Sequence, residues 1–150
     1  MTNPILRFSG DHRFLSNFFP SVVVHDGIRY PTVEHAFQAA KVLKPSRAAT
    51  VILRWPFSHP SKFTAAQAKR AGRRLSLRED WESVKLTVME ECLRAKFSDV
   101  DLRTKLLDTG DAELVEGNNW NDAFWGYDDV RERGENHLGK LLMKIRAELR

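Results

Sequence analysis

The amino-acid sequence predicts an α+β fold that is predominantly helical, with short strands near the N-terminus. Three observations lead to this fold class: β-branched residues flank an Asp-Gly pair before residue 31, apolar residues recur with helical spacing beyond it, and no repeat or flexible linker interrupts the 150 residues. Strands followed by a run of helices are typical of α+β proteins. A chain of this length matches one domain, so we expect a single compact domain over residues 1–150.

The first 30 residues predict short strands. Residues 5–8 form one candidate, and residues 22–25 and 28–30 form two more, separated by Asp26 and Gly27. An Asp-Gly pair between β-forming residues is a strong signal of a hairpin turn. We therefore expect the second and third strands to pair with each other.

A helix is predicted from residue 33 to about residue 43. Thr32 precedes it, and its hydroxyl can accept a hydrogen bond from a backbone N–H of the first turn. Val33, Phe37 and Ala40 then recur with helical spacing and form an apolar stripe. We expect this stripe to face the core.

Four more helices are predicted from apolar spacing and from residues that start or stop helices. They cover residues 62–71 with Gly72 as the stop, residues 80–97, a short segment opened by a capping-box-like sequence at 98–101 and ending at residue 107, and a C-terminal segment with Leu138, Leu141, Leu142, Ile145 and Leu149 on one face. Cys92 lies on the apolar face of the helix at 80–97, where we expect a buried and unreactive thiol.

Composition excludes several classes of protein. Apolar residues make up 42% of the chain and charged residues 29%, the balance of a folded globular protein rather than a disordered one. The net charge of +4 is compatible with an anionic ligand but too small to predict DNA binding. A single cysteine excludes an intrachain disulfide, and no apolar run reaches the roughly 18 residues of a membrane span. We expect a cytoplasmic protein that does not bind a membrane.

Neither a metal nor a cofactor is predicted. The histidines do not have the spacing of metal ligands, and the sequence contains no Gly-rich phosphate loop and no nucleophile elbow. The five histidines are His12, His25, His35, His59 and His137. Any chemistry is therefore expected to come from carboxylates, amides, amines and aromatic rings.

Glu34, Gln38 and Lys41 share one face of the helix predicted at 33–43, because they are spaced four and three residues apart. A carboxylate, an amide and an ammonium group on one face suit chemistry on a polar substrate. The alternative is a solvated face on which Glu34 lies near the positive N-terminal end of the helix. Both interpretations remain open at this point.

The segment 117–126 is aperiodic, yet Asn and Asp side chains alternate there with Trp120, Phe124 and Trp125. Loops of this kind often hold binding and catalytic groups, since aromatic rings can stack on a base and amides can bind its edge or a ribose hydroxyl. The alternative is that the rings fill the core and the Asn and Asp residues form turns. A basic run at 69–78 likewise predicts either a phosphate contact or a solvated helix face.

Several segments spread along the chain match one known family. They are residues 14–20, 26–27, 30–41, 72–73, 78–85, 88–89, 93–97, 106–107, 109–110, 114–116, 118–126 and 136–143. In this order they resemble the signature of the NADAR family, and the resemblance covers nearly the whole chain. Residues 45–60 are less similar, and we interpret them as a variable insertion.

The resemblance implies a helix-rich α+β fold and cleavage of N-glycosidic bonds. Members linked to riboflavin synthesis hydrolyse ribosylamino-pyrimidine intermediates, others are associated with NAD and ADP-ribose metabolism, and some remove ADP-ribose from guanine bases. The important acidic and aromatic positions of the family correspond to Glu34, Trp81 and Asp122 of this chain.

These implications define the predicted site. Breaking a ribosyl C–N bond builds positive charge on the ribose, which one carboxylate stabilises while a second directs the attacking water. Glu34 and Asp122 are assigned these two roles in either order, with Lys41 as an alternative nucleophile that forms a Schiff base. The predicted substrate-binding residues are Asn17, Gln38, Arg73, Arg78, Trp81, Asn118, Trp120, Trp125 and Asn136. Arg73 and Arg78 are expected to bind the phosphate.

The expected substrate is a small phosphorylated ribosylamine of the riboflavin pathway. One alternative is an ADP-ribosylated guanine, so that a nucleic acid would be bound only as substrate. Another is a module that binds ADP-ribose or NAD without turnover. Two carboxylates argue against such a module, because they repel the phosphates of the ligand.

Overall fold

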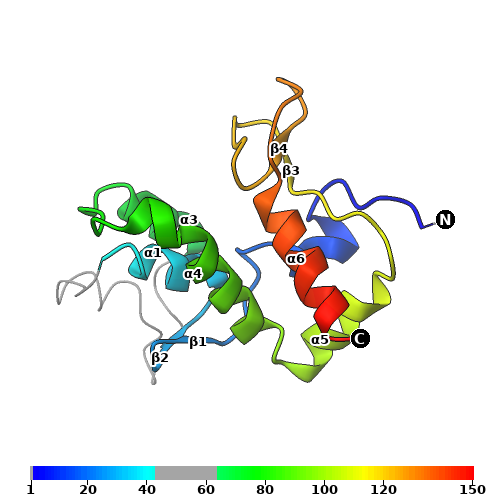
Figure 1. The fold of residues 1–150 in the computed structure, drawn as a ribbon, viewed down its shortest axis with the longest axis horizontal. Helices are drawn as coiled ribbons and strands as arrows, with labels where there is room; N and C mark the ends of the chain where they lie inside the picture. Colours follow the sequence, from blue (N-terminus) through cyan, green and yellow to red (C-terminus); the bar gives the residue numbers. More distant parts are fainter. Residues whose placement is uncertain (1, 43–63) are drawn as a thin grey trace. The chain divides into compact units, whose positions relative to one another are not determined.

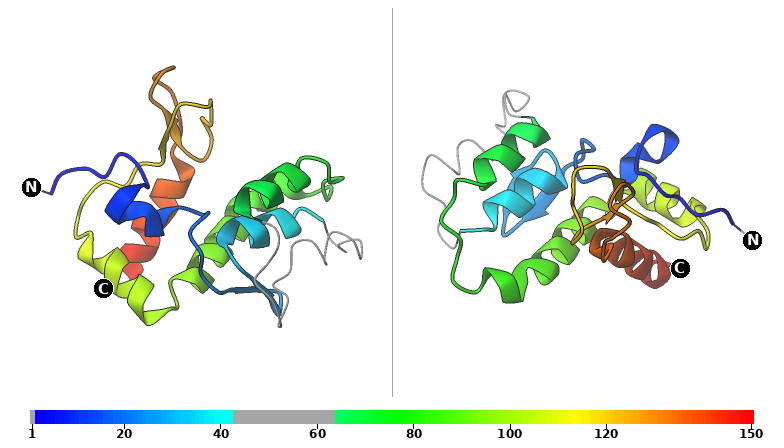
Figure 2. Two further views of the ribbon diagram at one scale, coloured as in Figure 1. Left: turned by 180° about the vertical axis from the view of Figure 1, so that it is seen from behind. Right: turned by 90° about the horizontal axis from the view of Figure 1, so that it is seen from above.

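The structure is a computed structural model that describes residues 2–42 and 64–150. Its contacts divide the chain into two compact units, one made of Met1–Ser16 with Phe97–Arg150 and the other of Asn17–Lys96. The elements of both units are labelled in Figure 1 and drawn from two further sides in Figure 2. Helices dominate and the strands are short, which confirms the predicted α+β class.

The unit of residues 17–96 begins with the predicted hairpin. Strands β1 (Val23–His25) and β2 (Ile28–Tyr30) pair antiparallel, with Val23 opposite Tyr30. The turn residues Asp26 and Gly27 have φ values of 50° and 74°. Such left-handed backbone at both central positions is the conformation for which Asp-Gly is suited, so the hairpin prediction is confirmed.

Helix α1 (Val33–Ala39) starts where predicted, and the Thr32 side chain accepts a hydrogen bond from the backbone N–H of His35. The predicted end near residue 43 is wrong. The N–H groups of Lys41 and Val42 bond three residues back, to the carbonyls of Gln38 and Ala39. The chain thus tightens into a turn after one and a half to two helical turns, and Lys41 follows the helix instead of continuing it.

Helices α3 (Ala65–Gly72) and α4 (Trp81–Lys96) complete this unit. Thr64 and Gln67 form a reciprocal capping box at the start of α3, while the predicted start at residue 62 lies outside the described residues. Helix α1 packs against both α3 and α4, as the adjacent ribbons in Figure 1 show. The core of the unit includes Val23, Val33, Ala36, Phe37, Ala68, Trp81, Met89, Cys92 and Leu93.

Cys92 is buried in α4 as expected. Burial raises the pKa of its thiol to about 12, with smaller contributions from nearby carboxylates. The thiolate is the reactive form of cysteine, so this side chain is inert at neutral pH.

The other unit contains a 3₁₀ helix η1 (Gly10–Leu15), α5 (Val100–Asp108), α6 (His137–Glu148) and two very short parallel strands, β3 (Gly117–Asn118) and β4 (Tyr127–Asp128). Its core includes Phe14, Leu15, Leu102, Leu106, Leu114, Leu138, Leu142 and Ile145. These residues confirm the apolar stripe predicted for the C-terminal helix.

Two local predictions for this unit are corrected. No strand covers residues 5–8, because only Ile5 forms a bridge, to Leu114. Asp99 caps α5 through a bond from the N–H of Leu102, so the cap lies one residue beyond the predicted Ser98. An Asp side chain at this position accepts the orphan N–H as well as a serine would.

The variable insertion predicted at 45–60 lies outside the described residues. Within the described part of the chain, no helix combines the length and the apolar character needed to cross a membrane.

Candidate active site

Glu34 and Gln38 are both buried on α1, at 6% and 4% exposure. The Gln38 Nε2 group donates a hydrogen bond of 2.7 Å to Glu34 Oε1, and the backbone N–H of Glu34 donates to the carbonyl of Asn17 at 3.1 Å. Carboxylates are rarely buried unless other groups compensate for the lost hydration. The face that carries Glu34 and Gln38 is therefore not the solvated surface of the alternative interpretation.

The bond to Glu34 fixes the orientation of the Gln38 amide, because only its nitrogen can donate to a carboxylate. Its oxygen Oε1 then points toward Gly72 on α3. A Cβ atom built on Gly72 would lie 1.7 Å from this oxygen. The absence of a side chain at Gly72 therefore provides the space in which the Gln38 amide reaches Glu34.

Two buried amide oxygens of this unit are unusual. Gln38 Oε1 and Asn17 Oδ1 accept no hydrogen bond from any residue that the structure describes. The amide nitrogen of Asn17 donates to the sulfur of Met89 at 3.6 Å. Buried polar atoms are nearly always hydrogen-bonded, so two acceptors without a donor among the described residues call for an explanation.

Lys41 is partly buried beside this group, with its Nζ 5.7 Å from the centre of the Phe37 ring. Burial lowers the pKa of the Lys41 amine, the charge of Glu34 acts in the opposite direction, and Lys69 and Arg73 lower the pKa further. A lowered pKa leaves more of the amine neutral and nucleophilic.

Trp81 is a core residue at the start of α4. It is 5% exposed, and its ring lies 5.1 Å from the Phe37 ring at an angle of 56°. The indole therefore supports the helix that carries Glu34.

The two predicted phosphate-binding arginines differ. Arg73 is exposed at the C-terminal cap of α3, and its positive charge helps to lower the pKa of Lys41 after the larger effect of burial. Arg78 donates two hydrogen bonds to the Asp80 carboxylate, at 2.5 and 2.9 Å, and these bonds raise the pKa of Arg78 and lower that of Asp80. Arg73 is thus the arginine better placed to accept an anion.

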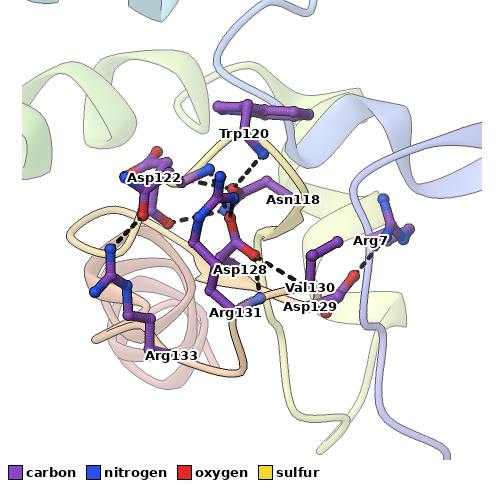
Figure 3. Close-up of polar contacts among 10 residues, drawn as sticks. Arg7, Asn118, Trp120, Asp122, Asp128, Asp129, Val130, Arg131 and Arg133 are labelled. Carbon is purple, nitrogen blue, oxygen red and sulfur yellow. Dashed lines mark hydrogen bonds and ion pairs between the residues drawn. The ribbon is translucent and has the colours of Figure 1, made fainter.

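The predicted loop residues belong to the other unit, and Figure 3 shows polar contacts of Asn118, Trp120 and Asp122. Asn118 is fully buried and uses its whole amide within the loop. Its Oδ1 accepts bonds from the N–H groups of Trp120 and Asp122, and its Nδ2 donates to the Asp122 carbonyl. Asn118 thus holds the shape of the loop.

Asp122 is partly buried, and its Oδ1 accepts a bond of 3.0 Å from the N–H of Trp125. Trp120 is 59% exposed, whereas Trp125 packs edge-on against Phe124 with ring centres 4.8 Å apart. Of the two predicted stacking rings, Trp120 is the one presented to solvent, and the interpretation of both tryptophans as core residues is wrong for it.

Asn136 precedes α6 with left-handed backbone, at φ 50°. Its side chain accepts a bond from the N–H of Glu116 and donates to the carbonyl of Leu114. Both polar atoms of the amide therefore join α6 to the strand-like segment before the loop, which makes Asn136 a structural brace in this structure.

One buried carboxylate escaped the sequence analysis. Asp128 is 0% exposed and accepts four hydrogen bonds from its own loop. A signal was present, because Asp is favoured where it can bind the N–H groups two and three residues ahead.

The two sets of predicted residues divide between the two units. Asn17, Glu34, Gln38, Lys41, Arg73, Arg78 and Trp81 belong to the unit of residues 17–96, and Asn118, Trp120, Asp122, Trp125 and Asn136 belong to the other. Among residues 2–42 and 64–150, no three His, Cys, Asp or Glu side chains are grouped as metal ligands would be.

The role of Gly72 leads to a prediction on stability. Replacing an ordinary helical glycine by alanine stabilises a helix by roughly 0.5–1 kcal/mol. Gly72→Ala should instead lower the free energy of unfolding by about 1–2 kcal/mol, because the new methyl group breaks the bond between Gln38 and Glu34. In a Gln38→Ala background the same change should no longer destabilise. Urea unfolding of the four proteins measures the coupling, and equal effects in both backgrounds would contradict this reading.

Comparison with known proteins adds the last observation. The family model of the NADAR domain matches residues 7–150. N-glycosidase YbiA of Escherichia coli strain K12 is 40% identical over 153 residues, covering 99% of this chain and 91% of the relative. N-glycosidase Npun_R5314 of Nostoc punctiforme is 40% identical over 136 residues, covering 90% and 84%.

A longer relative and a solved structure agree with this match. The riboflavin biosynthesis protein VVA0006 of Vibrio vulnificus is 38% identical over 99% of this chain, which spans 39% of that protein. The NMR structure of E. coli YbiA matches with a TM-score of 0.80 and 38% identity, over 99% of this chain and 86% of that one. With its motifs, its fold and its relatives in agreement, the chain belongs to the NADAR family.

Proposed function

We propose that this chain is an N-glycosidase that hydrolyses the C–N bond between ribose 5-phosphate and a pyrimidine-type amine, as found in riboflavin-pathway intermediates. The reaction class is supported by relatives named N-glycosidases that are 40% identical over nearly the whole chain. The substrate class is supported by the riboflavin biosynthesis protein of Vibrio vulnificus, which contains a similar segment. A cytoplasmic location is part of the proposal, in keeping with a single cysteine.

The observation that carries the proposal is the buried group around Glu34. Its carboxylate is held by the Gln38 amide, and the acceptor oxygens of Gln38 and Asn17 bond to no described residue. Ribose hydroxyls and ring or exocyclic amines are hydrogen-bond donors that match these acceptors. A ligand that donates to both oxygens removes the cost of burying them without partners.

The chemistry follows from where charge develops. As the C–N bond breaks, its electron pair leaves with the nitrogen and C1′ becomes oxocarbenium-like. A desolvated carboxylate such as Glu34 stabilises this cation more strongly than a hydrated one can. Water then adds to C1′ and gives up a proton to a base, while the departing nitrogen takes up a proton, so that the products are the free amine and ribose 5-phosphate. Asp122 is the proposed second carboxylate, and the two share the roles of cation stabiliser and base.

Lys41 supports a covalent variant of the same reaction. With the sugar ring open, the neutral amine replaces the departing base at C1′ and forms a Schiff base, which water hydrolyses to the aldehyde and the free lysine. The lowered pKa of Lys41 and its place next to the carboxylate favour this route.

The remaining predicted residues are proposed to bind the substrate. Arg73 is the preferred contact for the 5-phosphate, because the Arg78 guanidinium is already bound by Asp80. Trp120 is the preferred stacking surface for the base, since it is the more exposed ring of the loop. Asn118 and Asn136 act by holding this loop in shape.

A second candidate is the removal of ADP-ribose from a guanine base. The exposed cations at the end of α3 and the exposed Trp120 would suit the second phosphate and the second base of such a substrate. A module that only binds ADP-ribose is disfavoured, because a buried carboxylate costs affinity for an anion unless it does chemistry.

Base release from two substrates distinguishes these functions. We expect the purified protein to release the amine from the ribosylaminopyrimidine phosphate and to act far more slowly on ADP-ribosylated guanosine. Chromatography measures the base released from each substrate. The reverse preference would establish the second candidate. Turnover of neither substrate, together with calorimetric binding of ADP-ribose, would identify a binding module.

Replacement of each carboxylate tests the site. Glu34→Gln and Asp122→Asn should each lower kcat by roughly 100-fold or more, the effect typical of removing an acid–base group, with the fold retained by circular dichroism. Glu79→Gln and Asp101→Asn, both at exposed positions, are the matched controls and should keep full activity. A folded Glu34→Gln or Asp122→Asn variant with activity equal to its control removes that carboxylate from the mechanism.

Borohydride separates the covalent route from direct hydrolysis. If Lys41 forms the Schiff base, reduction during turnover should attach the sugar to the protein, and intact mass spectrometry should show the adduct on the wild type only. Lys41→Ala is the test variant and Lys140→Ala, exposed on α6, the control. Turnover by the wild type without any adduct would favour direct attack by water.

A further inference from the structure

We propose that Asp128 is a positioning residue whose buried carboxylate holds the loop segment 120–122 in the conformation that Asp122 needs for its role. This inference rests on the function proposed above, since it concerns how one of the two proposed carboxylates is placed.

The contacts of Asp128 span both arms of the loop, as Figure 3 shows. Oδ2 accepts a bond of 2.6 Å from the N–H of Asn121 and one of 2.9 Å from Nη1 of Arg131. Oδ1 accepts bonds of 2.9 Å and 2.7 Å from the N–H groups of Val130 and Arg131. One fully buried side chain therefore joins the segment that contains Asp122 to the turn at 128–131.

Only a carboxylate satisfies this set of donors. Both of its oxygens accept, whereas an asparagine in the same place would turn an NH₂ group toward N–H donors. Burial opposes the charged form, but the bonds from Arg131 and Asn121 outweigh it and lower the pKa of Asp128. The carboxylate thus stays charged and keeps its partners at neutral pH.

The segment that Asp128 binds needs such support. Asn121 has left-handed backbone, at φ 66°, a conformation that residues other than glycine adopt infrequently and that asparagine tolerates better than most. Asp122 follows it directly, so a change in the backbone of Asn121 rotates the Asp122 side chain. The bond from Arg133 Nη2 to Asn121 Oδ1, at 2.7 Å, braces the same residue from the side-chain end.

The next residue in the chain offers a matched control. Asp129 is also a carboxylate with an arginine partner, Arg7, but this ion pair is exposed at the surface. Exposed ion pairs contribute little, so Asp129→Asn removes a charge and a salt bridge of the same unit without touching Asn121.

The experiment compares Asp128→Asn with Asp129→Asn in the N-glycosidase assay and in amide NMR spectra. We expect Asp128→Asn to lower kcat by roughly 10-fold or more, because a misplaced catalytic group is costly, while KM changes less. The amide signals of Asn121 and Asp122 should shift, and signals of the 17–96 unit should not. Asp129→Asn should match the wild type in both measurements.

A kcat of Asp128→Asn within twofold of Asp129→Asn would overturn the proposal. Should Asp128→Asn fail to fold, Arg131→Met removes one of the four bonds, with Arg7→Met as its control. Arg131→Met should lower kcat by about threefold and shift the amide signal of Asn121. A kcat and an Asn121 signal equal to those of Arg7→Met would also overturn the proposal. If the wild type releases no base from any N-glycoside, the proposed function fails, while the NMR comparison still reports whether Asp128 fixes the loop.

Discussion

The hydrogen bond between Gln38 and Glu34 is the interaction on which the candidate site in residues 17–96 depends. It gives the buried Glu34 carboxylate a hydrogen-bond donor from the same short helix. It requires the glycine at position 72, because the amide oxygen occupies the volume that a Cβ atom would fill. Helix α3 thus makes room for the Gln38 amide because it has no side chain at Gly72.

Amides are used in two different ways in the two units. In Asn118 and Asn136 both the amide oxygen and the amide nitrogen bond to backbone groups. Asn118 thereby fixes the shape of a loop, and Asn136 fixes the start of α6. In Asn17 and Gln38 the amide nitrogen donates a hydrogen bond, whereas the buried amide oxygen accepts none from residues 2–42 and 64–150. Since a native fold seldom leaves such atoms unsatisfied, this difference supports the proposal that Asn17 and Gln38 bind the substrate, whereas Asn118 and Asn136 stabilise the structure.

Local signals in the sequence predicted the local structure well. The Asp26-Gly27 hairpin, the Thr32 cap and the helix at 81–96 depend on backbone conformation and apolar spacing, which neighbouring residues determine. The strand at 5–8 failed because strand formation needs a partner along its length, and the structure provides one only at Ile5.

The candidate site was predictable in its residue types but not in its roles. The spacing of Glu34 and Gln38 placed them on one face, yet burial of that face depends on α3, which no local pattern reveals. Asp128 was missed because its partners, Asn121 and Arg131, lie on both sides of it in a loop without periodicity. Only the folded structure shows which side-chain oxygens and nitrogens already make hydrogen bonds.

Glu34 and Asp128 are buried carboxylates of the described residues, and the proposals give them different roles. Asp128 accepts four hydrogen bonds, which fix its side chain in one position. Burial opposes the charged form, but the bonds from Arg131 and Asn121 stabilise the charged carboxylate and so lower the pKa of Asp128. Because its oxygens already accept these bonds, Asp128 is poorly suited to stabilise the cation that forms on the sugar. Glu34 accepts a hydrogen bond from the neutral Gln38 amide, and its charge acts on Lys41, whose pKa burial lowers. A desolvated carboxylate stabilises a nearby positive charge more strongly than a hydrated one, which is why the proposal places the chemistry at Glu34 and the support of the loop at Asp128.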